Sequence, residues 1–130
     1  MGDRGNIIIK AQGGKVADLY LYTHWGGYEL LNTLHDAMSR RERWNDDQYL
    51  ARIIFCQMVR GHEINETGFG ISTYLGDNEQ PLITVDVQAR RVSVAEHRGR
   101  PGASWTFEEF VALDEAARNR AFRGVEVDDA

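Results

Sequence analysis

The fold is decided by Leu19-Tyr20-Leu21-Tyr22-Thr23-His24-Trp25-Gly26-Gly27-Tyr28, which passes from an alternating strand pattern through a short loop into a helix pattern. Side chains alternate across a strand, so Leu19 and Leu21 share one face and the two tyrosines share the other. The first N–H groups of a helix lack partners within the helix and attract anions. We therefore expect the ligand site at this turn.

The segments on either side of this stretch continue the two patterns. Residues 6–11 form a β-branched run that the Gly13-Gly14 turn separates from residues 16–22, which predicts a hairpin. Apolar residues recur at helical spacing over residues 28–41. This order predicts a hairpin followed directly by a helix.

A second helix is expected over residues 46–60, with Asn45 or Asp46 as its N-cap. Its composition is apolar on nearly all sides, which predicts burial on nearly all sides. Arg52 is the only charge among these apolar residues and is expected to be buried, in an ion pair or against an anionic ligand. Cys56 is expected to be buried and inert.

Three strand patterns and a final helix complete the chain. Residues 67–75, 82–87 and 91–96 predict a three-stranded meander, and residues 97–104 predict a loop. Thr106 followed three residues later by Glu109 matches a capping box, which begins a helix that Ala117 would extend.

The order β-β-α-α-β-β-β-α indicates an α+β fold with a five-stranded, mainly antiparallel sheet and helices packed on one face. We expect one domain over residues 1–124 and an acidic C-terminal tail over residues 125–130.

The composition limits the class of function. A net charge of −5 argues against a binder of duplex nucleic acid. The chain has no apolar run long enough to span a membrane and no signal-peptide pattern at its start, so we expect a cytoplasmic protein. A single cysteine excludes an intramolecular disulfide and a zinc site made of cysteines alone.

The turn that ends the first stretch concentrates groups suited to a ligand. Trp25 would stack on a planar group, while the Gly26 and Gly27 amides and His24 would hold an anionic group. The alternative is a tight turn in which the tryptophan anchors the core. The further contacts that we expect come from the side chains of Tyr22, Arg4 and Arg52.

A nearly bare strand face at Gly68, Gly70 and Ser72 would accept the close approach of a helix, another subunit or a flat ligand, and a packed helix is the expectation. With Tyr20 and Tyr22 on an adjacent strand, the same face would form the floor of a pocket.

Signals for metal binding and catalysis are weak. His62 and Glu66 have a spacing that could place two ligands together, but no metal motif is complete, and we expect no metal and no cofactor. Ser72 lacks the nucleophile-elbow sequence. We therefore expect a binding protein rather than an enzyme.

Three stretches resemble small uncharacterised proteins of bacteria and their phages: residues 2–7 (GDRGNI), 20–27 (YLYTHWGG) and 66–73 (ETGFGIST). The resemblance carries no activity to this chain. Its phage setting implies a counter-defence factor that sequesters a signalling nucleotide or blocks a host protein.

The sequence thus leads to a first hypothesis and two alternatives. The first is a non-enzymatic binding domain for a small anionic, nucleotide-like ligand, as a monomer or a homo-oligomer. The second is an inhibitor that uses its acidic surface to bind a host defence protein. The third is a small hydrolase that acts on a nucleotide-like substrate.

Overall fold

The computed structural model describes residues 2–11, 17–65 and 67–124. The expected turn at residues 13–14, Glu66 and the tail at residues 125–130 lie outside these ranges, wholly or in part. The elements in chain order are β1 (Gly5–Ile9), β2 (Leu19–Thr23), the 3-10 helix η1 (Gly27–Glu29), α1 (Leu30–Met38), α2 (Asp47–Met58), β3 (Phe69–Ser72), β4 (Ile83–Asp86), β5 (Arg91–Val94), β6 (Ala103–Thr106), α3 (Phe107–Val111) and α4 (Glu115–Arg123).

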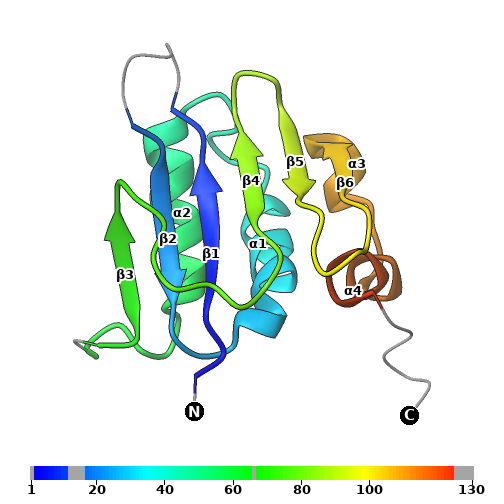
Figure 1. Ribbon diagram of the computed structural model, residues 1–130. Helices are drawn as coiled ribbons and strands as arrows, with labels where there is room; N and C mark the ends of the chain where they lie inside the picture. Colours follow the sequence, from blue (N-terminus) through cyan, green and yellow to red (C-terminus); the bar gives the residue numbers. More distant parts are fainter. Residues whose placement is uncertain (1, 12–16, 66, 125–130) are drawn as a thin grey trace.

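The strands form one mixed sheet in the order β3-β2-β1-β4-β5-β6 (Figure 1). The expected hairpin is confirmed, because β1 and β2 pair antiparallel with Ile7 opposite Leu21. All other pairs are antiparallel except β1 and β4, which run parallel. The fold is therefore α+β, as expected.

Two details of the expected sheet are wrong. The sheet has six strands, because residues 103–106, at the end of the expected loop, pair with β5. The expected meander is also not formed, because β3 pairs with β2 at one edge, whereas β4 pairs with β1 in the interior. Both differences depend on long-range pairing, which local alternation does not specify.

The helices α1 and α2 lie behind the sheet in Figure 1, and α3 and α4 lie beside β6. The core is formed by aliphatic residues of the sheet and by the inner sides of the helices, with two phenylalanines of α3. Its members include Ile7, Leu21, Val85, Val92, Leu31, Leu34, Leu50, Ile54, Phe107 and Phe110. On the opposite face, the connection formed by residues 73–82 crosses in front of β2 and β1 (Figure 1).

Several predicted helix ends are confirmed by hydrogen bonds. The Asp46 carboxylate accepts from the first N–H groups of α2, and Thr106 and Glu109 form the reciprocal capping box of α3. The last helix is interrupted, however. Asp114 accepts from the Ala117 N–H and begins α4 as a separate helix, so the expected extension of one helix through Ala117 is wrong.

The expectations for Arg52 and Cys56 are also wrong. Leu50 and Ile54 are buried, whereas Arg52 and Cys56 are exposed. The two exposed side chains are four residues apart and therefore share one side of the helix. The helix α2 covers the sheet with one side only, so Arg52 needs no buried partner.

Candidate functional site

The loop that follows β2 is fixed by its own polar groups and by β3. The buried Thr23 hydroxyl donates to the Trp25 carbonyl at 2.5 Å, and the His24 N–H donates to the Gly68 carbonyl at 2.8 Å. Gly26 has a φ of 76°, a left-handed conformation that glycine adopts without steric cost. These contacts turn the chain from the strand into η1 and fix the position of Trp25.

The N–H groups at the start of η1 already have an acceptor within the chain. The Gly27 N–H donates to the Asp3 carbonyl at 2.8 Å, and the Tyr28 N–H donates to Asp3 Oδ2 at 3.0 Å. The other oxygen of this carboxylate accepts from the Gln80 side chain at 2.6 Å. Asp3 therefore occupies the place that an external anion was expected to take, and the Gly27 amide points to Asp3.

Gly27 is also required by close packing. A Cβ at this position would lie 2.6 Å from the Asp3 carbonyl oxygen, closer than side chains approach such an atom. The second glycine of the pair thus serves the attachment of the N-terminal segment to the helix start.

Aromatic rings cover part of the nearly bare strand face, where a helix was the expectation, and a small pocket of about 280 Å³ at this face is lined by Tyr22, Gly70 and Ser72 among others. The Trp25 indole lies against Gly68, and the Tyr22 ring lies beside Gly70 and Gly76, 3.7 and 3.8 Å from the position of an added Cβ. Tyr22 and Gly70 are directly opposite each other on β2 and β3. A large ring over a cross-strand glycine protects the backbone of that glycine and fills the missing volume.

Tyr22, His24 and Arg4 form a polar cluster at the crossing connection. Tyr22 Oη lies 3.0 Å from His24 Nδ1, and burial raises the pKa of Tyr22. The Arg4 guanidinium pairs with Asp77 at 3.2 Å and with Glu79 at 3.3 Å. Hydrogen bonds from the Arg4 N–H and side chain lower the pKa of Glu79. The positive charge of Arg4 is thus compensated within the chain.

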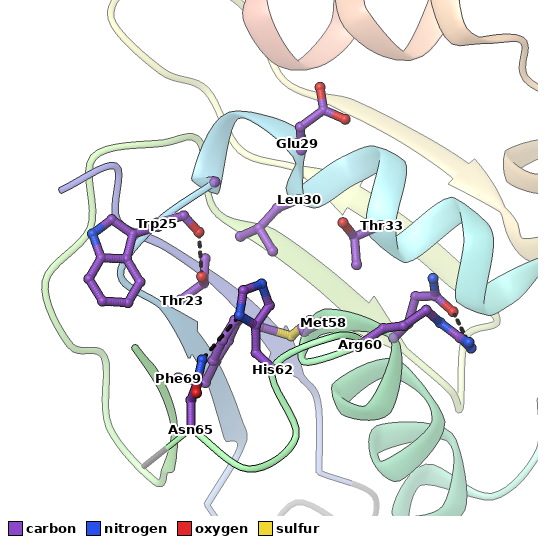
Figure 2. Close-up of a pocket in the computed structure, with 12 residues that line it drawn as sticks. Thr23, Trp25, Glu29, Leu30, Thr33, Met58, Arg60, His62, Asn65 and Phe69 are labelled. Atoms are coloured by element: carbon purple, nitrogen blue, oxygen red, sulfur yellow. Dashed lines mark hydrogen bonds between the residues drawn. The ribbon is translucent and has the colours of Figure 1, made fainter. Parts of the chain in front are cut away.

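A pocket of about 560 Å³ opens on the other side of the loop, between the end of β2, the start of α1 and the segment that joins α2 to β3 (Figure 2). It is lined by Thr23, Trp25, Gly26, Glu29, Leu30, Thr33, Gln57, Met58, Arg60, His62, Asn65 and Phe69. Trp25 and Gly26 are the two expected site residues in this lining. Tyr22, His24, Gly27, Arg4 and Arg52 are outside it.

The segment after α2 supplies three polar side chains of the pocket, those of Arg60, His62 and Asn65. Asn65 Nδ2 lies 3.1 Å from His62 Nδ1. An amide N–H donates in this pair, so a neutral His62 ring carries its proton on Nε2. The Arg60 guanidinium donates to Gln57 Oε1 at 3.4 Å. Phe69 stands beside His62, with ring centroids 5.9 Å apart.

Glu29, the acidic residue in the lining, is compensated by an ion pair. Glu29 pairs with Arg123 at 2.6 Å, and the Arg123 guanidinium also stacks over the Tyr28 ring at 4.7 Å from its centroid. Arg60 forms no ion pair with any residue that the structure describes. The lining therefore offers a cation without offering a free carboxylate.

Arg60, Asn65 and Phe69, which line this pocket, were not expected as site residues, and His62 was considered only as a metal ligand. In the described ranges, His, Cys, Asp and Glu side chains form no group of three or more that could hold a metal ion. The signal in the sequence for these lining residues is a polar segment directly after a helix end, because loops often carry binding residues.

Among the described residues, no helix combines the length and the apolar character that crossing a membrane requires. Comparisons with protein-family models, with curated proteins and with solved structures found no match.

Proposed function

We propose that this protein is a non-enzymatic binding domain that holds a small planar ligand with an anionic group, such as a nucleotide, in the pocket beside Trp25. The observation that carries the proposal is the combination of a pre-positioned tryptophan with an arginine that forms no ion pair among the described residues.

Trp25 is a suitable stacking surface because its ring is exposed and yet held in place. The side chain is 54% exposed. Its indole lies against Gly68 and meets the His24 ring edge-on, with centroids 4.9 Å apart. A ring with few available conformations loses little entropy when a base stacks on it, and stacking of one base contributes about 1–3 kcal/mol.

Arg60 is suited to the anionic part of the ligand. Figure 2 shows Trp25 and Arg60 on opposite sides of the pocket, with His62 between them. A guanidinium group binds phosphate oxygens through paired N–H donors, and His62, whose Nδ1 accepts from Asn65, offers a further donor at Nε2. A base at Trp25 and a phosphate at Arg60 would use both ends of the pocket.

Thermal unfolding in the presence of a panel of nucleotides and cyclic dinucleotides tests this proposal. A ligand at about 100 times its Kd stabilises the folded state by about 2.7 kcal/mol, which raises the Tm by several degrees. We expect Trp25→Ala and Arg60→Gln to remove this rise. Tyr49→Ala is the matched control, because Tyr49 is 56% exposed and lies outside the pocket lining.

The proposal fails if the folded wild-type protein shows no rise with any member of the panel, or if Trp25→Ala keeps the full rise. Chromatography of the nucleotide after long incubation separates simple binding from hydrolysis. Recovery of unchanged ligand supports a binding domain, and a product formed at a rate proportional to protein concentration supports the hydrolase alternative.

A further inference from the structure

The strand β3 is an edge strand with unused backbone hydrogen-bonding groups. Within the described ranges it pairs with β2 alone, and Figure 1 shows it at the edge of the sheet. The His24 N–H donates to the Gly68 carbonyl, so Gly68 bonds inward. Bonding alternates along an antiparallel pair, and the N–H and C=O groups of Phe69 and Ile71 therefore point away from β2.

The side chains along this edge do not oppose association. Residues 67–75 contain no charged residue and no proline. Ile71, Tyr74 and Leu75 are exposed to 56%, 71% and 44%. Natural proteins usually protect such edges with charges, prolines or a covering element. The strand β6 forms the other edge of the sheet. A proline, Pro101, precedes β6, and the helix α3 begins directly after β6.

We propose that β3 pairs antiparallel with β3 of a second copy of this chain and joins the two sheets into one. The charge of −5 on each copy opposes association through most of the surface, whereas residues 67–75 carry no charge, and Asp77, which lies beside this edge, is paired with Arg4. This proposal does not depend on the proposed ligand.

The register follows from the positions of the outward groups. A two-fold axis at Gly70 places Phe69 of each copy opposite Ile71 of the other and forms four backbone hydrogen bonds. The resulting aromatic and β-branched pairs are favourable across strands. An axis at Ile71 would need Thr73 in extended conformation to complete its ladder, but the strand ends at Ser72 and the chain then bends.

Disulfide trapping tests both the partner and the register. In a Cys56→Ser background, Gly70→Cys places two thiols at a pair without hydrogen bonds, where Cα atoms are about 4.5 Å apart, within the range of a disulfide. Gly70 has room for a Cβ, whose nearest neighbour is the Tyr22 ring at 3.7 Å. The proposed register separates Ile71→Cys from its equivalent by two residues along the strand, beyond disulfide reach.

We expect Gly70→Cys to form a covalent dimer under mild oxidation and Ile71→Cys to form little. Efficient cross-linking of Ile71→Cys, or none by either variant, would overturn the proposal. Sedimentation of the unmodified protein up to roughly 0.5 mM provides a second measurement, because small interfaces bind weakly.

In that experiment, Ile71→Lys should be monomeric and Tyr49→Lys, at a site of equal exposure on α2, should dimerise like the wild type. A wild-type protein that stays monomeric over this range, or an Ile71→Lys variant that dimerises unchanged, would contradict the proposal.

Discussion

Gly68 and Gly61 both have φ angles in the left-handed region, of 98° and 86°, but their surroundings differ. A Cβ at Gly68 would overlap the Trp25 indole, whereas a Cβ at Gly61 would meet no atom within 4 Å. Substitutions at both glycines strain the backbone, but only a substitution at Gly68 also displaces the Trp25 ring, which forms one side of the pocket. Comparing the two substitutions therefore isolates the cost of displacing the ring.

We expect Gly68→Ala to lower the free energy of unfolding by about 1–3 kcal/mol more than Gly61→Ala, because only the first adds a steric overlap with a packed side chain to the strained backbone. Chemical denaturation of both variants measures the difference. In a Trp25→Ala background the excess should disappear. An excess that persists without the indole would show that the ring is not packed against Gly68.

At the scale of elements, the connection between β3 and β4 is attached to the N-terminal segment by polar contacts. The Arg4 N–H donates to Glu79 Oε1 at 2.8 Å, and the Glu79 N–H donates back to the Arg4 carbonyl at 2.8 Å. Asn6 Nδ2 donates to the Asp77 carbonyl at 3.0 Å. These contacts hold the connection across β1 and β2.

The attachment should depend on pH. The folded state lowers the pKa of Glu79, so its carboxylate adds stability above the ordinary pKa of about 4.5 and loses this contribution as the pH falls through the folded-state pKa. We expect Glu79→Gln to be less stable than the wild type at pH 7 and to approach it near pH 3. Urea denaturation of the wild type and of Glu79→Gln between pH 3 and pH 7 measures the difference in their free energies of unfolding. A constant difference at all pH values would contradict the assigned role of the carboxylate.

At the scale of the whole molecule, the local features were predictable and the long-range ones were not. The hairpin, the Asp46 cap and the capping box at Thr106 follow from residues close together in sequence. The expected meander placed β3 next to β4, and a position beside Tyr20 and Tyr22 was only an open alternative, because local alternation does not specify which distant strand pairs with it. In the structure β3 pairs with β2, with Tyr22 opposite Gly70.

In the candidate site, too, the features set by neighbouring residues were predictable and the contacts between distant segments were not. Trp25 and Gly26 were predicted because an aromatic residue and a glycine stand together where a strand ends. It was not predicted that Asp3 occupies the helix start, because nothing local indicates which distant carboxylate accepts from the Tyr28 N–H. Arg60 and His62 come from the segment between α2 and β3, and no local pattern indicates that this segment lies beside Trp25.

The pocket beside Trp25 is proposed to hold a planar, anionic ligand. An NMR titration of the nitrogen-15-labelled protein with the nucleotide that gives the largest thermal shift tests it most directly. We predict shifts of the Trp25 indole signal and of the Gly26, Arg60 and His62 amides, with Tyr49 unchanged. Signals that do not move, or that move only around Arg4 and the Tyr28 amide, would contradict it.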